Sequence, residues 1–277
     1  MKFEDFLKKA TQQLQKAGIG TARLDSLILI EDVLGVDRAI LLAHPETNIS
    51  SSQLAKLTKL LKRRGNHEPL AYVRGTTEFY GRNFVINTSV LEPRPESEAM
   101  IDLLKHYVKN GTFSTQPASH VTISDVGTGS GALGITAALE IPKSSVELLD
   151  ISQKALEIAK INVDKFTLNI TMLKSNLLMN SKQQSVVLLC NLPYVPDDYS
   201  INEAAQHEPK LAIFGGRDGL DLYCKLFKQL TLHTNKPLLI LTEALPEQHQ
   251  KLATIAAKTE YRLDMTDDFI QAFVPNN

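Results

Sequence analysis

Residues 124–133, with the sequence SDVGTGSGAL, decide the fold of this 277-residue chain. They follow an apolar run that begins at Val121 and they open a run of helix formers, so the pattern predicts a strand, a glycine turn and a helix. In the turn, Gly127, Gly129 and Gly131 allow backbone N–H groups to approach a ligand without Cβ atoms in the way. This order of elements indicates a nucleotide cofactor bound at the first turn of an α/β domain.

Downstream of the glycine turn, predicted strands and helices alternate. Further strands are expected at residues 146–150, 171–175, 186–190 and 237–242, and helices at 152–166, after 219 and at 246–258. The strands are continuous apolar runs, as in a parallel sheet that is buried on both faces. The alternation therefore predicts a doubly wound, Rossmann-like α/β domain. Residues 261–274 predict two more strands around a turn at Asp267 and Asp268, which would add a C-terminal antiparallel hairpin.

A small all-α bundle is predicted before this domain. Apolar residues recur at helical spacing over 3–14 and 24–34, each run ends near a glycine, and Ser51 or Ser52 is expected to cap a third helix. Aromatic and β-branched residues over 78–90 predict a hairpin, and a polar loop is expected over 110–120. We therefore expect a helical domain at 1–75, a β-hairpin linker at 76–92 and a catalytic α/β domain at 93–277.

Composition narrows the class of protein. Hydrophobic residues make up 43% of the chain, and no apolar run reaches the roughly 20 residues that a membrane-spanning helix requires. The amino terminus lacks the apolar core of a secretory signal, so we expect a cytoplasmic protein without membrane contacts. A net charge of −1 argues against a strongly basic nucleic-acid binder, and no stable nucleic-acid partner is expected.

Cysteines and histidines give no sign of a metal site. Cys190 and Cys224 are too few for a disulfide framework, and their apolar surroundings predict buried free thiols. The seven histidines lack metal-ligand spacing, so no metal is expected.

The strand over 146–150 ends in Asp150, where a carboxylate can accept hydrogen bonds from both hydroxyls of a ribose. Because Gly127, Gly129 and Ala132 also satisfy the dinucleotide fingerprint, NAD remains an alternative. The additional Gly131 resembles the GxGxG loop of S-adenosylmethionine-dependent methyltransferases, and the expected C-terminal hairpin is typical of that fold. Sheet order would place Asn176 and Leu177 near the adenine of either cofactor.

The stretch NLPY at 191–194 follows the strand over 186–190. Since the carboxyl ends of parallel strands line the ligand crevice, Asn191 is expected beside the glycine turn. NLPY resembles the [DNS]PP[YFW] motif of methyltransferases that act on planar amino groups, and in this variant form it resembles ribosomal RNA adenine methyltransferases. An amide or aniline-like nitrogen shares its lone pair with a π-system, so it attacks a methyl group poorly unless it is held and polarised.

Each residue of this motif has an expected role. The Asn191 side-chain oxygen and the Leu192 carbonyl would accept the two N–H groups of the substrate, and Tyr194 would stack on its plane and tolerate a nearby sulfonium. Pro193 fixes the turn because its ring locks φ. The usual motif has proline where this chain has Leu192, which loses rigidity but keeps the carbonyl.

Three longer stretches resemble the HemK/PrmC family of protein-(glutamine-N5) methyltransferases. LEPRPESE at 91–98 resembles the PRPxTE segment of the family, residues 207–223 resemble its FEPxxALxGGxDGLxxY segment, and residues 66–81 match its domain junction. The resemblance covers nearly the whole chain. It implies methylation of the glutamine in the Gly-Gly-Gln motif of peptide chain release factors, a role in translation termination, with the helical domain helping to grip the factor.

The resemblance also implies the site. The methyl donor, S-adenosylmethionine, would be held by Gly127, Thr128, Gly129, Ser130, Gly131, Asp150, Asn176, Leu177 and Asn191, and the glutamine by Asn191, Leu192, Pro193 and Tyr194. Arg94 and Glu208 are expected either at the substrate mouth or in structural roles. The protein is expected to act as a monomer. The chain departs from the family pattern at His207, Asn176 and Leu177, and its last strand lacks the usual arginine.

Other functions remain open at this point. They are methylation of another planar amino group, such as a ribosomal protein glutamine or adenine N6 of RNA or DNA, and a family member without catalytic activity.

Overall fold

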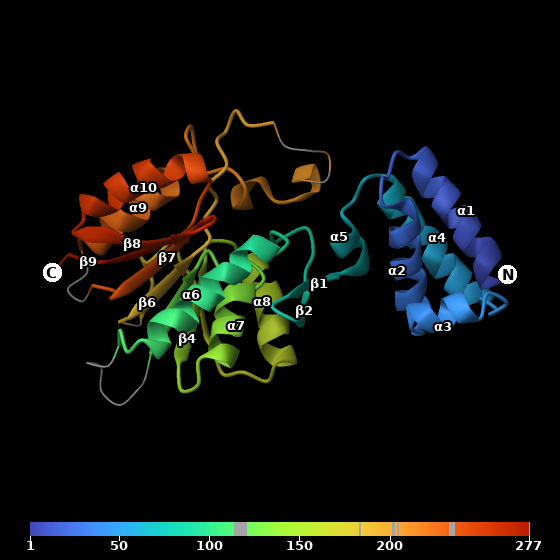
Figure 1. The fold of residues 1–277 in the computed structure, drawn as a ribbon, viewed down its shortest axis with the longest axis horizontal. Coiled ribbons are helices and arrows are strands. Elements are labelled where there is room, and N and C mark those ends of the chain that lie inside the picture. The colour runs from blue at the N-terminus through green and yellow to red at the C-terminus, as the bar shows by residue number, and fades with distance from the viewer. Residues whose placement is uncertain (114–120, 183, 201–202, 204, 233–235, 277) are drawn as a thin grey trace. The chain divides into compact units, whose positions relative to one another are not determined.

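The structure is a computed structural model that describes residues 1–113, 121–182, 184–200, 203, 205–232 and 236–276 (Figure 1). Contacts divide the chain into two compact units. One unit comprises residues 1–76 with the described part of 201–207, and the other comprises residues 77–200 and 208–277. Most of the polar loop expected over 110–120 lies outside the described residues.

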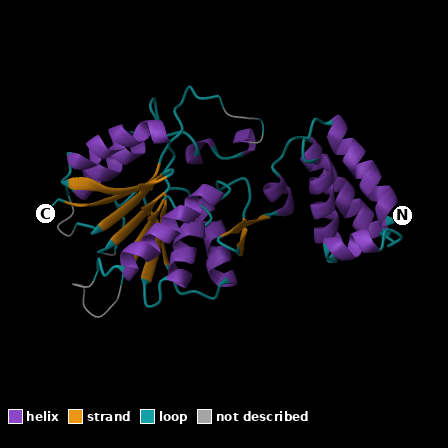
Figure 2. Ribbon diagram, viewed as in Figure 1, coloured by secondary structure: helices purple, strands orange, loops and turns teal. Residues whose placement is uncertain are grey.

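The first unit is helical (Figure 2). Its helices are α1 (Phe3–Lys16), α2 (Ala22–Leu34), α3 (Arg38–Ala43), α4 (Ser51–Gly65) and α5 (Leu70–Arg74). Apolar residues of α1, α2 and α4, such as Leu14, Leu29 and Leu57, form a shared buried core. Gly35 ends α2 in the left-handed conformation, which glycine adopts without a Cβ penalty.

Two details of this unit differ from the sequence predictions. The cap of α4 is Ser50, not Ser51 or Ser52: its Oγ accepts a hydrogen bond from the backbone N–H of Gln53, and the Gln53 side chain accepts one from the backbone N–H of Ser50. This reciprocal capping box requires a serine three residues before the glutamine, which only Ser50 satisfies. The short helices α3 and α5 were not predicted, because five or six residues are too few to show a helical period.

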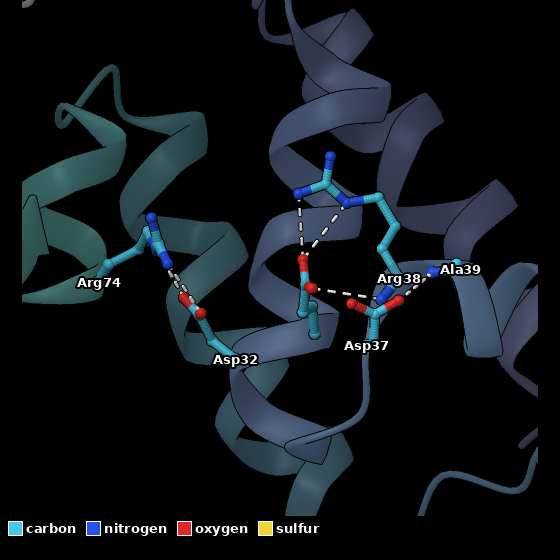
Figure 3. Close-up of polar contacts among 6 residues, drawn as sticks. Asp32, Asp37, Arg38, Ala39 and Arg74 are labelled. Atoms are coloured by element: carbon cyan, nitrogen blue, oxygen red, sulfur yellow. Dashed lines mark hydrogen bonds and ion pairs between the residues drawn. The ribbon is translucent and has the colours of Figure 1, made fainter. Parts of the chain in front are cut away.

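Polar contacts connect the helices of this unit. Arg74 of α5 forms a bidentate pair with Asp32 of α2, at 2.6 and 2.9 Å (Figure 3). Asp37 caps α3 by accepting a hydrogen bond from the backbone N–H of Ala39 at 2.7 Å. Arg64, one of the basic residues Lys62, Arg63 and Arg64 in the last turn of α4, forms an ion pair with the buried carboxylate of Asp25 at 2.7 Å.

The second unit contains a seven-stranded sheet. Its strands are β3 (Thr122–Val126), β4 (Ser145–Asp150), β5 (Thr171–Lys174), β6 (Val187–Cys190), β7 (Leu239–Glu243), β8 (Tyr261–Asp267) and β9 (Ile270–Pro275). The order is β5-β4-β3-β6-β7-β9-β8, with neighbours parallel from β5 to β7 and antiparallel at β9 and β8. The predicted doubly wound sheet and its C-terminal hairpin are confirmed.

Helices cover both faces of this sheet (Figure 1). One face carries α6 (Glu98–Lys109), α7 (Ala132–Glu140) and α8 (Gln153–Lys165), and the other carries α9 (Asp221–Leu230) and α10 (His249–Ala257). Each face has its own apolar core against the sheet. A short hairpin of β1 (Thr76–Phe79) and β2 (Arg82–Val85) turns through Tyr80 and Gly81, both with positive φ, as a two-residue hairpin loop requires.

One prediction about the cysteines is wrong. Cys190 is buried at the end of β6 as expected, but Cys224 is exposed. It lies on the outward side of α9, whose opposite side buries Tyr223, Phe227 and Leu230 against the sheet. Within the described ranges, no helix has the length and apolar character needed to cross a membrane.

Candidate active site

A cavity of about 210 Å³ lies at the carboxyl ends of the parallel strands. Residues that follow β3, β4, β5 and β6 line it, as the topology of a doubly wound sheet dictates. The predicted site residues that it brings together are Gly127, Thr128, Gly129, Ser130, Asp150, Asn176, Leu177, Asn191, Leu192 and Pro193. Gly131, Tyr194, Arg94 and Glu208 are not among the described residues that line it.

The glycine turn after β3 uses backbone conformations that glycine adopts most readily. Gly127, Gly129 and Gly131 have φ values of 77°, 56° and 84°, all in the left-handed region. A Cβ on Gly127 would lie 3.0 Å from Leu192, and one on Gly131 would lie 2.9 Å from Ile135. The turn therefore packs directly against the NLPY segment and against α7.

Asp125 of β3 stabilises this turn by accepting hydrogen bonds, although the sequence analysis did not single it out. Its Oδ2 accepts hydrogen bonds from the Thr128 hydroxyl at 2.5 Å and from the Gly134 backbone N–H at 2.9 Å. The carboxylate is fully buried, and this burial raises its pKa to about 6.

Asp150 lies at the end of β4 and faces the same turn. Its Oδ2 accepts a hydrogen bond from the Gly129 backbone N–H at 2.9 Å, and its Oδ1 accepts one from Ser152 N–H at 2.8 Å. Burial raises the pKa of this carboxyl, while the hydrogen bonds from Ser152 and Gly129 oppose the shift. Each carboxylate oxygen has a second lone pair, so the group retains acceptor capacity for the two hydroxyls of a ribose.

A buried asparagine connects this turn to the β1–β2 hairpin. Asn162 of α8 accepts a hydrogen bond from Val85 N–H at 2.7 Å and donates to the carbonyls of Val85 and Ser130, each at 2.9 Å. The donor and acceptor groups of its side chain are all used. The glycine turn and strand β2 are thereby held by one side chain.

The loop after β5 forms another wall of the cavity. Leu177 is buried with a φ of 56°, and Asn176 accepts a hydrogen bond at its Oδ1 from the Lys225 ammonium at 2.9 Å. Gln229 of α9 fixes the same loop, because it donates to the Asn176 carbonyl and accepts from Leu178 N–H.

Asn191 is part of a buried polar cluster. Its Nδ2 donates to Ser97 Oγ at 2.9 Å, and Ser97 in turn donates to Glu243 Oε2 at 2.5 Å. The Tyr194 hydroxyl donates to the other oxygen, Glu243 Oε1, at 3.0 Å. Burial raises the pKa of Glu243, while the hydrogen bonds from Ser97 and Tyr194, together with the nearby amide of Asn191, act in the opposite direction.

The backbone after Asn191 is fixed from several sides. Leu192 is buried, and its N–H donates to the Tyr223 hydroxyl at 3.3 Å; that hydroxyl also lies 2.6 Å from the Glu243 carbonyl oxygen. The Gln248 side chain donates to the Tyr194 carbonyl at 2.8 Å. A Cβ on Gly219 would overlap that same carbonyl oxygen, so the glycine segment at 215–219 packs directly on the motif.

Arg94 and Glu208 pair with each other beside the cavity. Arg94 Nη2 lies 2.8 and 2.6 Å from the two carboxylate oxygens of Glu208. Burial raises the pKa of Glu208, and Arg94 opposes the shift. Their neighbours Pro93 and Pro209 line the cavity, so this ion pair joins two segments of its wall.

Comparison with known proteins identifies the family. Residues 5–75 match the PrmC N-terminal domain, and residues 108–208 match the methyltransferase small domain. The release factor glutamine methyltransferase of Coxiella burnetii is 32% identical over 279 residues, which cover 96% of this chain and 94% of that protein. This chain belongs to the release factor glutamine methyltransferase family.

Other relatives of this chain are longer. The bifunctional methyltransferase of Rickettsia bellii is 32% identical over 249 residues, which cover 79% of this chain and 44% of that protein. The chain thus spans about half the length of the Rickettsia bifunctional methyltransferases that it matches. A methyltransferase from Pyrococcus furiosus shares the fold, with a TM-score of 0.52 and 15% identity over 82% of this chain and all of that one.

The structure accounts for a leucine at position 192, where the [DNS]PP[YFW] motif that NLPY resembles has proline. Proline has no N–H, whereas leucine brings a buried donor that must be satisfied. The Tyr223 hydroxyl accepts that hydrogen bond.

In the described part of the chain, no group of three or more histidine, cysteine or acidic side chains gathers as metal ligands would.

The sequence analysis did not predict the residues that hydrogen-bond to the cavity-lining segments and fix their positions. They are Ser97, Asp125, Asn162, Tyr223, Glu243 and Gln248. A signal existed for Glu243, because it ends the strand next to β6, and the carboxyl ends of parallel strands line the crevice.

Proposed function

We propose that this chain uses S-adenosylmethionine to methylate the side-chain amide nitrogen of the glutamine in the Gly-Gly-Gln motif of peptide chain release factors. The observation that carries the proposal is one cavity that holds both the glycine turn with Asp150 and the Asn191–Pro193 segment. The names of the relatives in Coxiella burnetii and Koribacter versatilis support the substrate.

The residues of the cavity suit the methyl donor. The three left-handed glycines keep side chains out of the turn, and Asp150 offers free lone pairs where a ribose would lie. We assign Gly127, Thr128, Gly129, Ser130 and Asp150 to the donor, with Gly131 keeping the turn close to α7 and with Asn176 and Leu177 at the donor's adenine. When bound, the donor supplies an activated methyl group on a sulfonium.

The NLPY segment would hold the substrate amide. A primary amide has two N–H groups, and the Asn191 side-chain oxygen and the Leu192 carbonyl are acceptors that could bind one each. Holding both hydrogens fixes the direction of the nitrogen and favours positive charge as it develops there. The chain needs no general base for this step, because the nitrogen is strongly acidic once it carries a fourth bond and releases its proton to water.

We assign substrate recognition to the helical unit, within the domain limits of 1–75 for this unit, 76–92 for the hairpin linker and 93–277 for the catalytic domain. The match of residues 5–75 to the PrmC N-terminal domain supports this assignment. Arg94 and Glu208 are assigned to the wall of the substrate mouth.

The experiment is incubation with a radiolabelled methyl donor and either a release factor or bulk RNA. Label is expected on the peptide that carries Gly-Gly-Gln, and a release factor with that glutamine changed to alanine should take up none. Label on RNA would instead favour a base amino group such as adenine N6 as the substrate, and label on neither substrate would contradict the proposed activity.

A further inference from the structure

The buried carboxylate of Glu243 lies directly behind Asn191. Glu243 and Ser97 are each 1% exposed, and they come from the end of β7 and from the 3₁₀ turn Pro95–Ser97 before α6. Ser97 is within hydrogen-bond distance of both Asn191 Nδ2 and Glu243 Oε2. Burying a carboxylate is unfavourable unless several hydrogen bonds compensate, so the position of Glu243 calls for a reason beyond packing.

The direction of each hydrogen bond in this cluster follows from the chemistry of its members. An ionised carboxylate accepts hydrogen bonds and donates none, so the hydroxyls of Tyr194 and Ser97 must both point their hydrogens at Glu243. Ser97 has one hydrogen, which is then committed. It can offer Asn191 only a lone pair, and only the NH₂ group of the asparagine can meet it.

An asparagine amide has two orientations that differ by exchange of its oxygen and its nitrogen. When the NH₂ group is directed at Ser97, the amide oxygen takes the opposite position. Asn191 also lines the cavity, so this oxygen is the atom of the amide that remains for a substrate there. In the other orientation the NH₂ group would meet the N–H groups of a substrate amide, and two donors repel each other. The activity therefore depends on a single orientation of this amide.

We propose that Glu243, acting through Ser97, is a positioning residue that holds the Asn191 amide with its oxygen toward the substrate. The carboxylate sets the polarity of the Ser97 hydroxyl, and the hydroxyl sets the polarity of the amide. This inference rests on the proposed function, because it assigns the orienting group for the residue that receives the glutamine amide.

Two variants of Ser97 that match in volume test the proposal. Ser97→Thr keeps the hydroxyl, whereas Ser97→Val replaces it with a methyl group of similar shape. We expect Ser97→Val to lower kcat for release factor methylation by about 10- to 100-fold relative to Ser97→Thr, with cofactor affinity within about twofold. Equal kcat values in the two variants would overturn the proposal.

Glu243→Gln provides a second test that leaves Ser97 intact. The glutamine NH₂ group can donate to Ser97, which frees the Ser97 hydrogen to point at the Asn191 oxygen and favours the wrong amide orientation. We expect a loss of about 10-fold or more in kcat. In the Asn191→Ala background the same change should have no further effect, because the group that it orients is absent. Full additivity of the two changes would count against the proposal.

A spectroscopic readout separates this inference from the proposed function. With asparagine side chains labelled with ¹⁵N, the Asn191 NH₂ signals are assigned by their loss in Asn191→Ala. Their hydrogen exchange should be at least about 10-fold faster in Ser97→Val than in Ser97→Thr, because the acceptor is lost. Unchanged exchange would refute the positioning role. If the unmodified enzyme methylates no release factor while the exchange result holds, the proposed substrate is wrong and the orienting role stands.

Discussion

Asn191 and Asp150 line the same cavity, but they are expected to serve different steps. We predict that Asn191→Ala leaves cofactor affinity nearly unchanged and lowers the methyl-transfer rate by about 100-fold or more, because it removes a contact that strengthens as charge develops. Asp150→Ala should instead weaken cofactor binding by about 10-fold or more, because it removes the ribose acceptor and leaves Gly129 N–H without its partner.

Calorimetry with the methyl donor and single-turnover transfer rates distinguish the two variants. Each variant is the control for the other. Equal cofactor affinity in Asp150→Ala and the unmodified chain would refute the ribose assignment, and undiminished turnover in Asn191→Ala would remove the basis of the proposed mechanism.

Asp125 predicts a dependence of stability on pH. Its pKa rises from an ordinary value of 3.8 to about 6 because it is buried, so between these pH values the folded state binds a proton more tightly than the unfolded chain. Its contribution to stability is thus fully present below about pH 4 and is lost as pH rises through 6, a change on the order of 2–3 kcal/mol.

Asp125→Asn tests this, since the amide oxygen can still accept from Thr128 and Gly134 but does not titrate. We expect the variant to gain stability relative to the unmodified chain as pH rises from 4 to 7, as measured by urea unfolding at several pH values. A stability difference that stays constant over this range would contradict the prediction.

Among the elements, the glycine segment at 215–219 is expected to support the motif by close packing. Gly219 and Gly81 both have positive φ, at 79° and 68°, but a Cβ would overlap the Tyr194 carbonyl at Gly219 and would meet nothing within 4 Å at Gly81. We predict that Gly81→Ala costs roughly 1–2 kcal/mol from backbone strain alone. Gly219→Ala should cost on the order of 3 kcal/mol or more, because it also displaces the carbonyl that Gln248 binds.

Urea unfolding midpoints measure the stability difference, and transfer rates report on the motif. Gly219→Ala should also slow methyl transfer, while Gly81→Ala should leave the rate within about twofold. Similar losses of stability in the two variants would show that packing on Tyr194 contributes nothing beyond strain.

The sequence alone predicts most of the strands and helices, but not the contacts between distant elements. The sheet, its crossover helices and the C-terminal hairpin were predictable, since buried parallel strands and glycine turns leave strong local patterns. The contact between Ser97 and Glu243 was not, because it joins residues 146 positions apart and depends on how α6 meets the end of β7. Likewise, the exposed position of Cys224 follows from which side of α9 faces the sheet, and an apolar neighbourhood in the sequence does not specify that.

For the whole molecule, the proposed role of the helical unit predicts a difference between protein and peptide substrates. Ile40 and Leu42 of α3 are 55% and 45% exposed, and neighbouring exposed apolar side chains form the kind of surface patch that marks sites of protein contact. We expect Leu42→Ser to raise KM for an intact release factor by about threefold or more, and to leave KM for a short Gly-Gly-Gln peptide unchanged.

The matched control is Leu232→Ser, a change at an equally apolar but still more exposed residue of the catalytic unit. It should affect neither substrate. If Leu42→Ser alters neither KM value, α3 takes no part in binding the factor, and recognition must be sought elsewhere on the chain.

Asn162 has a consequence for protein engineering. The Asn162 side chain hydrogen-bonds both Val85 of the hairpin and Ser130 of the glycine turn. These two segments can therefore be transferred together into another protein only if Asn162 is transferred with them. A chimera that received the hairpin of a relative, but carried an apolar residue at 162, would lose the bond to Ser130 as well. Its donor pocket would then loosen even though no residue of that pocket had been exchanged.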